Sequence, residues 1–379
     1  MSKIRILSDS LASQVAAGEV VERPAAVVRE LVENSLDAGA AHVAVHVQRG
    51  GTALIRIVDD GSGMSREDAM LCIERHATSK IRTKEDLSAI GTFGFRGEAL
   101  PSIASVSRFK ISTRPAEALT GTEIEIHGGK MHSVSECGGP AGTSIEVRSI
   151  FFNVPARRKF LRTESTEYAH VEQQFRLHAI AHPGVAFTLT RDGQTVFHLP
   201  ATRDDLERIR GLIGDLADRL VEVEPFEHRG VRVSGHIGGP GVSRSTRQMQ
   251  LTFLNGRPIE SPSISYGLRE GYHTVLMKGQ HPVTFLRIDM DGQEGSPFSR
   301  RHRCARGDRT GGLPITRRFS KLPHRTFHLE TPHPHGGSVF RAAVGNASSG
   351  RDDRCPSPAA SRNEPVGGAT RPRSLLTPQ

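Results

Sequence analysis

Residues 29–39 read Arg29-Glu30-Leu31-Val32-Glu33-Asn34-Ser35-Leu36-Asp37-Ala38-Gly39, and they are the most informative eleven residues of the chain. At 3.6 residues per turn, Glu30, Asn34 and Asp37 fall on one face of a helix. The apolar residues fall largely on the other face, which suits packing against a sheet: Val27, Val28, Leu31, Val32 and Leu36. Gly39 stands where such a helix ends. The stretch therefore predicts an amphipathic helix whose polar face carries carboxylates and an amide.

This polar face carries the groups that hydrolysis of a metal–nucleotide complex requires. Glu30 can take a proton from water, and the amide oxygen of Asn34 is the kind of ligand that Mg²⁺ prefers. Taken alone, such a segment is more often an ordinary solvated helix face. The rest of the sequence has to decide between these two interpretations.

Composition restricts the classes of function. The 379 residues allow two or three domains, and the formal net charge is +9. Residues 291–379 hold 14 Arg and 1 Lys against 7 acidic residues, whereas the first 290 residues carry 35 basic and 34 acidic side chains. A basic surface on the first 290 residues therefore requires local clustering. The four cysteines form no C-x-x-C pair, and there is no secretory signal or 18-residue apolar run, so we expect a cytoplasmic protein without a membrane span.

Hydrophobic periodicity predicts the architecture up to about residue 290. Strands are expected at 42–47, 54–58, 107–113, 122–127, 143–147, 185–190 and 195–199, and helices at 66–77 and 166–181. These elements predict an α+β domain over residues 1–203, with helices layered on a mostly antiparallel sheet. A helical bridge over 204–220 leads into a smaller α/β domain that ends near residue 290, with strands at 231–236, 250–254 and 283–289 and a helix at 263–274.

The last 89 residues differ in character. They hold 10 of the 22 prolines, are rich in Arg and show no sustained period. Residues 291–379 are therefore expected to be disordered, and a basic nucleic-acid-binding arm is the alternative.

Further segments carry groups suited to a nucleotide. Asp59 directly follows a strand, where its carboxylate can accept a hydrogen bond from an exocyclic amine such as that of adenine, and Gly61 and Gly63 let the backbone pass close to a ring. Residues 78–80, Thr-Ser-Lys, offer two hydroxyls and an ammonium to a phosphate.

A glycine-rich loop at residues 91–100 opens into a helix, and its backbone N–H groups can form an anion cradle. The loop matches neither a Walker A sequence nor a Rossmann fingerprint. Gly142-Thr143 enters a strand that could close the same pocket from below.

These segments together resemble one known superfamily. Residues 30–39, 59–63, 94–100 and 142–143 are similar to the four motifs of the gyrase, heat-shock chaperone, histidine-kinase and MutL ATPases. Within it, the chain resembles the MutL family of bacterial DNA mismatch-repair proteins over residues 1–290, most specifically at 14–24, 75–80, 94–100, 153–161 and 253–257. The resemblance implies a Bergerat-type ATPase domain over 1–203 and an incomplete, ribosomal-protein-like transducer and DNA-binding domain over 204–290.

By that resemblance, Glu30 activates the attacking water and Asn34 holds Mg²⁺. The other residues that contact ATP are expected to be Asp37, Ala38, Asp59, Gly61, Gly63, Met64, Thr78, Ser79, Lys80, Gly94, Phe95, Arg96, Gly97, Glu98, Ala99, Leu100 and Thr143. Arg269 stands where the family places an arginine that contacts DNA without sequence preference. The family also implies an ATP-dependent N-terminal homodimer, a mismatch sensor of the MutS type, strand-nicking or helicase partners, and a nucleoid-associated location in a bacterial cytoplasm.

The family pattern breaks after Asp289. The family continues with a segment V-D-V-N-V-H-P-x-K whose lysine reaches the γ-phosphate, and residues 289–295 here read Asp-Met-Asp-Gly-Gln-Glu-Gly with nothing similar after them. The Arg-for-Lys bias, the many prolines and the lost periodicity suggest a shifted reading frame or a truncated gene. A shifted frame requires that an intact V-D-V-N-V-H-P-x-K be encoded in another frame of the DNA.

Two functions stay open at this point. The first is a weak Mg²⁺-dependent ATPase switch that couples the nucleotide state to the binding of DNA and repair partners. The second is a nucleotide-binding module with negligible turnover, either a non-functional fragment or an ATP-gated clamp. No nuclease activity is expected in either case.

Overall fold

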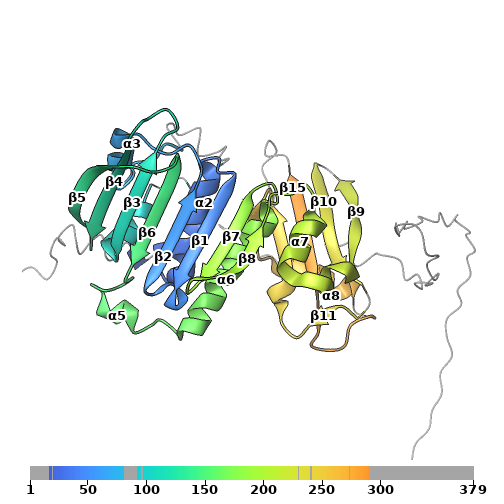
Figure 1. The fold of residues 1–379 in the computed structure, drawn as a ribbon. Helices are drawn as coiled ribbons and strands as arrows, with labels where there is room; N and C mark the ends of the chain where they lie inside the picture. Colours follow the sequence, from blue (N-terminus) through green and yellow to red (C-terminus); the bar gives the residue numbers. More distant parts are fainter. Residues whose placement is uncertain are drawn as a thin grey trace, which may run out of the picture. The chain divides into compact units, whose positions relative to one another are not determined.

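An eight-stranded mixed sheet forms the N-terminal part of the computed structural model (Figure 1). The structure describes residues 17–18, 20–80, 92–94, 97–228, 230–239, 241–272 and 274–290, so the predicted disordered tail lies outside the described residues. The strand order is β5-β4-β3-β6-β2-β1-β7-β8. The strands are β1 (His42–Gln48), β2 (Leu54–Asp59), β3 (Arg108–Arg114), β4 (Gly121–His127), β5 (Lys130–Cys137), β6 (Gly142–Arg148), β7 (Ala186–Arg191) and β8 (Gln194–Leu199).

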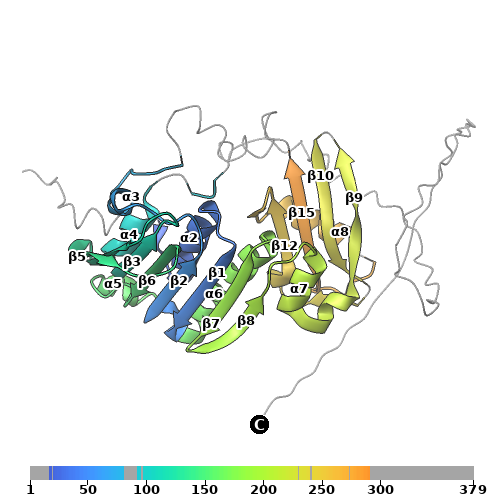
Figure 2. The same ribbon diagram turned by 45° about the horizontal axis from the view of Figure 1, so that its top comes forward.

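The pairing confirms the expected α+β class. Only β1 and β7 run parallel, and the other neighbours in this sheet are antiparallel. The helices are α2 (Pro24–Asp37), α3 (Arg66–Leu71), α4 (Ala99–Ser105), α5 (Pro155–Arg158) and α6 (Glu164–Ala181). Figures 1 and 2 show α2 and α6 against one face of the sheet.

The opening helix forms as its periodicity predicts. α2 begins at Pro24 and ends at Asp37, after which Gly39 adopts a φ of 73°, the left-handed conformation that glycine tolerates best. Its apolar face is buried in the main core: Val27, Val28, Leu31 and Val32 are each at most 1% exposed. Burial of these side chains leaves the opposite face for the polar groups.

One predicted helix is shorter than expected, and one strand of this sheet was not predicted. The helix predicted over 66–77 begins correctly, with the Ser65 hydroxyl accepting the Asp68 N–H, but it ends at Leu71. Beyond the helix the Glu74 N–H donates to the Leu71 carbonyl oxygen, and His76 takes a left-handed φ of 64° and donates its N–H to the Gly97 carbonyl oxygen. Strand β5 was not predicted, since almost every one of its residues is exposed and it carries no apolar alternation.

A second sheet of five strands follows, in the order β13-β12-β15-β10-β9. Its strands are β9 (Leu220–His228), β10 (Val231–Gly238), β12 (Gln250–Leu254), β13 (Arg257–Pro258) and β15 (Thr284–Met290), and β11 (Ser243–Arg244) pairs with β14 (His281–Pro282). Helix α8 (Pro262–Gly271) contributes Ile264 and Leu268 to a small core with Val233, Leu286 and Ile288. The prediction missed β9, which contains Pro225 and is mostly exposed on the edge of the sheet.

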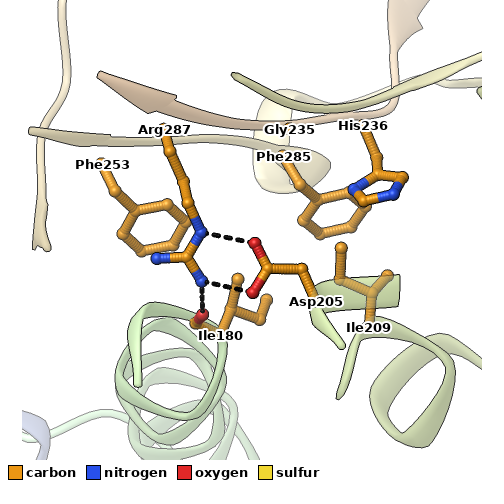
Figure 3. A pocket seen from close by; sticks show the side chains of 8 residues that line it. All are labelled: Ile180, Asp205, Ile209, Gly235, His236, Phe253, Phe285 and Arg287. Atoms are coloured by element: carbon orange, nitrogen blue, oxygen red, sulfur yellow. Dashed lines mark hydrogen bonds and ion pairs between the residues drawn. The ribbon is translucent and has the colours of Figure 1, made fainter. Parts of the chain in front are cut away.

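A half-buried arginine, Arg287, joins the second sheet to the helices that precede it (Figure 3). α7 (Asp205–Ile213) and a 3₁₀ turn (Gly214–Arg219) form the predicted helical bridge. Arg287 on β15 makes two hydrogen bonds to the Asp205 carboxylate, at 2.7 and 3.0 Å, and donates to the carbonyl oxygens of Ile180 and Ala181 at 2.7 and 3.1 Å. One guanidinium therefore pairs with the start of α7 and caps the last carbonyls of α6. Among the described residues, no helix is long and apolar enough to span a membrane.

Two titratable groups face each other where α2 packs on α6. The Glu33 carboxylate lies 4.0 Å from Nε2 of His178, whose side chain is fully buried. Burial lowers the pKa of His178 to about 3, so its imidazole is neutral at physiological pH. Burial, followed by the charge of Glu30, raises the pKa of Glu33 to about 7. In mild acid, both the Glu33 carboxyl group and the His178 imidazole are therefore neutral. Above pH 7, the Glu33 carboxylate is charged and lies beside a neutral imidazole.

Replacement of Glu33 by glutamine tests this packing. The folded protein holds the Glu33 proton up to about pH 7 while the unfolded chain releases it near 4.5, so stability falls as the pH rises through this window. Glu33→Gln removes this titratable group. We expect the free energy of unfolding of the variant, relative to that of the parent, to be about 3 kcal/mol higher at pH 8 than at pH 4.5. Denaturant unfolding across this pH range measures the difference, and a constant offset between variant and parent contradicts the assignment.

Candidate functional site

The polar face of α2 is occupied by a lysine from the opposite side of the site. The Lys80 ammonium lies 2.7 Å from the Asn34 amide oxygen and 2.6 Å from the Asp37 carboxylate. The side chains of Asp37 and Lys80 are 7% and 19% exposed. Asn34 and Asp37 thus form a pair of oxygen ligands that already holds a positive charge in a poorly solvated position.

The start of the glycine-rich loop is bound to the same carboxylate. Asp37 accepts the backbone N–H groups of Phe93 at 3.0 Å and Gly94 at 3.3 Å. A Cβ atom at position 94 would lie 3.2 Å from the Lys80 nitrogen, so glycine permits this close approach. Phe95 and Arg96 lie outside the described residues.

Glu30 lies one helical turn before Asn34 and has a different partner. Its carboxylate accepts hydrogen bonds from Nη2 and Nε of the adjacent Arg29, at 2.7 and 3.3 Å. The Glu30 side chain is 21% exposed, so water can reach it. The structure thus places Asn34 and Asp37 against the loop, whereas Glu30 pairs with its sequence neighbour.

Asp59 is held in place by three donors at the end of β2. Its carboxylate accepts the Ser35 hydroxyl at 2.7 Å and the N–H groups of Gly61 and Thr143 at 3.0 and 3.2 Å. The antiparallel register of β2 with β6 places Thr143 directly opposite Asp59. Burial raises the pKa of Asp59, and its three hydrogen bonds oppose that shift.

The residues after Asp59 pack closely against neighbouring backbone. The Ser62 N–H donates to the Ala38 oxygen at 3.0 Å, which joins the end of α2 to this turn. Gly63 has a φ of 65°, and a Cβ there would lie 2.2 Å from the Arg114 carbonyl oxygen. The Met64 N–H donates to the Thr113 hydroxyl at 3.0 Å, and Thr113 contacts the Thr143 hydroxyl at 2.9 Å.

The segment around residue 78 lies against the end of the glycine-rich loop. The Thr78 hydroxyl accepts the Lys80 N–H at 3.2 Å, and Ser79 is exposed. Gly97 has a φ of 60° and leaves no room for a Cβ against the Ala77 backbone. Glu98 precedes α4 and lies 3.5 Å from the His76 ring, and Ala99 and Leu100 form the first residues of that helix.

Arg269 is separate from this cluster. It lies on α8 of the second sheet, where its exposed guanidinium stands 5.3 Å from the centre of the Tyr266 ring. The structure therefore brings the α2, β2 and loop residues together, and it leaves Arg269 on a different surface.

Three residues of the site were not anticipated from the sequence: Ser35, Thr113 and Arg257. Ser35 is a polar residue on the buried side of α2, and that mismatch with the apolar pattern is a usable signal. Thr113 and Arg257 carry no such signal, because their contacts join segments far apart in the chain. Phe93 lies within the predicted glycine-rich loop, and its N–H donates to Asp37.

The donor set fits a hard cation. The oxygens of Asn34 and Asp37 bind the Lys80 ammonium, and Mg²⁺ prefers oxygen ligands of this kind. No cluster of three His, Cys, Asp or Glu side chains occurs in the described part of the chain, so a metal here would complete its coordination with phosphate and water.

Comparison with known proteins identifies the family. Residues 22–147 match the family described as "Histidine kinase-, DNA gyrase B-, and HSP90-like ATPase", and residues 209–294 match "DNA mismatch repair protein, C-terminal domain". DNA mismatch repair protein MutL of Opitutus terrae is 52% identical over 292 residues, and that of Akkermansia muciniphila is 51% identical over 292 residues. Each match covers 77% of this chain and 46% of the relative, so the chain spans about half the length of these relatives.

Solved structures give the same result for the fold. The Aquifex aeolicus MutL ATPase domain complexed with ADP is 31% identical with a TM-score of 0.54, and the match covers 72% of this chain and 93% of that domain. The N-terminal domain of a DNA repair protein has a TM-score of 0.64 at 22% identity, which supports the fold alone. The two family matches, the curated relatives and the similarity to the Aquifex domain agree, and the chain belongs to the MutL family of DNA mismatch-repair proteins.

Proposed function

We propose that this chain is an ATP-binding and slowly ATP-hydrolysing switch that uses Mg²⁺. The observation that carries the proposal is the cluster on α2, in which the Lys80 ammonium binds the Asn34 amide oxygen and the Asp37 carboxylate, and two backbone N–H groups bind the same carboxylate. These are the ligands and donors that phosphoryl transfer requires. The ADP-bound relative shares the fold of this domain.

Glu30 is the proposed general base. It lies on the same face of α2 as Asn34, and its partial exposure lets it take a proton from an attacking water. Arg29 orients the carboxylate through two hydrogen bonds. Magnesium, when bound, would neutralise phosphate charge, and Asn34 would be its ligand from the protein.

Binding of the triphosphate would require an exchange of partners. Lys80 and the N–H groups of Phe93 and Gly94 are donors that all point to Asp37 in this structure. A phosphate offers the same donors a second set of anionic acceptors, so we propose that they transfer from Asp37 to the nucleotide. Asp59 would accept the adenine amine with one oxygen, since its three protein donors leave lone pairs available.

A second candidate is a nucleotide-binding module with negligible turnover. Two observations favour it: Lys80 engages the Asn34 oxygen that the metal would need, and Arg29 engages Glu30. The sequence also lacks the family's V-D-V-N-V-H-P-x-K segment. The two candidates differ in their dependence on Glu30.

The switch is proposed to act on DNA and repair partners. Exposed Arg269 on α8 would contact phosphates without reading sequence. The proposed partners are a mismatch sensor of the MutS type, strand-nicking or helicase proteins, and a second copy of the chain.

ATP-dependent dimerisation would appear as a doubling of mass in sedimentation with a non-hydrolysable ATP analogue, and an unchanged mass would refute it.

Replacement of Glu30 by glutamine separates the two candidates. We expect Glu30→Gln to lower the single-turnover rate of ATP hydrolysis at least 100-fold, because general-base catalysis contributes about that factor or more. The Kd for Mg·ATP should change less than about threefold, since the amide is isosteric. Glu67→Gln, exposed on α3, is the matched control. Equal residual rates in parent and Glu30→Gln, together with tight binding, would support the second candidate instead.

Replacement of Asp59 by asparagine tests adenine recognition. The amide of the asparagine can accept hydrogen bonds only through its oxygen, and its NH₂ group is a donor that would face the adenine amine, which is also a donor. We expect Asp59→Asn to reduce the preference for ATP over GTP at least tenfold in competition binding, because an unpaired polar group in a recognition site costs this much or more. Asp60→Asn is the control, since Asp60 instead binds His42 at 2.6 Å. A preserved ATP preference in a folded Asp59→Asn protein contradicts the role.

Substitution of Arg269 tests the DNA-binding surface. Removal of one phosphate contact should weaken binding about equally for all DNA sequences and reduce the slope of log K against log salt by about one. Arg210→Ala is the control, because Arg210 is exposed but bound to Asp218 at 2.7 Å. Fluorescence anisotropy with the full chain measures the slope, to which the Arg-rich tail contributes equally in every variant. An unchanged slope in Arg269→Ala removes this residue from the interface.

A further inference from the structure

The tip of a hairpin in the second sheet touches the glycine-rich loop. Nη2 of Arg257, at the start of β13, donates a hydrogen bond to the Thr92 carbonyl oxygen. The guanidinium carbon lies 5.3 Å from the centre of the Phe93 ring, a cation–π distance. These residues are separated by about 165 positions in sequence, so the contact joins two parts of the fold.

The hairpin that carries Arg257 is rigidly held. Asn255 and Gly256 form its turn with φ values of 47° and 75°, the left-handed conformations that a tight two-residue turn requires. The Asn255 side chain accepts the Met290 N–H at 2.8 Å and donates to the Met290 oxygen at 3.1 Å. Arg257 is therefore fixed relative to β15, which Arg287 anchors to α6 and α7.

The contact continues inward to the ligands of the proposed metal. The Phe93 N–H binds one oxygen of Asp37, and the other oxygen binds Gly94 and Lys80. Lys80 in turn binds the Asn34 oxygen. An uninterrupted series of hydrogen bonds thus leads from the second sheet to Asn34, with Phe93 as the residue where the two halves meet.

A neutral histidine supports Phe93 on another side. His182, just after α6, packs edge-to-face against the Phe93 ring with centroids 5.3 Å apart. Burial, followed by the charge of Arg287, lowers the pKa of His182 to about 4. The imidazole is therefore uncharged at neutral pH and does not repel the Arg257 guanidinium on the same ring.

We propose that Arg257 is a positioning residue that transmits the placement of the second sheet to the nucleotide site. It fixes the backbone at Thr92 and the ring of Phe93, and thereby aligns the N–H groups of Phe93 and Gly94 on the phosphate side of α2. The role rests on the proposed function, because the aligned donors are those that the triphosphate would use. The chain lacks the family's V-D-V-N-V-H-P-x-K segment, whose lysine would reach the γ-phosphate. Arg257 would thus be a contact from the second sheet to the nucleotide site that does not depend on that segment.

Amide exchange in the nucleotide-free full chain tests the positioning directly. We expect the Phe93 and Gly94 amides to exchange at least tenfold faster in Arg257→Ala than in the parent, since removal of the guanidinium frees the loop from the hairpin. Arg257→Lys keeps the charge and one donor but loses the planar contact with Phe93, so it should restore only part of the protection. Arg232→Ala, exposed on β10 of the same sheet, should leave exchange unchanged.

Nucleotide measurements on the same variants complete the test. The adenine and metal contacts come from β2 and α2, so the Kd for Mg·ATP should change less than about threefold in Arg257→Ala. The single-turnover rate at saturating ATP should fall about tenfold, because misplaced N–H donors matter most in the transition state.

The outcomes separate this inference from the proposed function. If the parent chain binds no Mg·ATP, the proposed function fails, whereas faster exchange in Arg257→Ala still supports the structural link. If the parent binds ATP and Arg257→Ala matches it in exchange and in rate, the inference is overturned and the proposed function stands. A melting temperature that falls as far in Arg257→Lys as in Arg257→Ala, with equal exchange in both, would reduce Arg257 to a residue of general stability and also overturn the inference.

Discussion

The Asp37 carboxylate organises the site because it is one anion shared by three donors. Its two oxygens bind the Lys80 ammonium and the N–H groups of Phe93 and Gly94, and its side chain is 7% exposed. A carboxylate withdrawn from water requires such partners, since an unpaired charge at this depth is strongly unfavourable. The same requirement draws the loop and Lys80 onto α2. A triphosphate is the anion that could replace Asp37 for all three donors at once.

The fold makes this arrangement possible by burying one face of a single helix. α2 places its apolar side chains in the core of the eight-stranded sheet, and the polar side chains of Glu30, Asn34 and Asp37 then share the remaining face. The sheet supplies the second fixed carboxylate, because β6 pairs with β2 in a register that sets the Thr143 N–H against Asp59. The two acidic groups thus have separate environments, which suits separate tasks at the two ends of a nucleotide.

Two arginines of the second sheet bind different parts of the preceding fold, and one of them reaches the site. Arg287 binds Asp205 and the last carbonyl groups of α6, so it fixes the position of β15. Arg257 binds the loop itself, through Thr92 and Phe93. Because the Asn255 side chain joins the hairpin to β15, a displacement of the strand would be transmitted to the loop. On the proposed role of Arg257, a partner that shifts the second sheet would change the alignment of the Phe93 and Gly94 N–H donors.

The sequence alone determined the helix that carries the site, the α+β class and the family. Helical periodicity places Glu30, Asn34 and Asp37 on one face, and this follows from local geometry without knowledge of any neighbour. Only the tertiary structure decided that Lys80 and the N–H groups of Phe93 and Gly94 converge on Asp37, that Ser35 and Thr143 hold Asp59, and that Arg257 reaches the loop. It also shows that the predicted 66–77 helix ends at Leu71 and that the His76 N–H binds the Gly97 carbonyl oxygen instead of a helical partner. Such contacts join residues distant in the chain, and no local pattern encodes which distant partner will satisfy a given donor or charge.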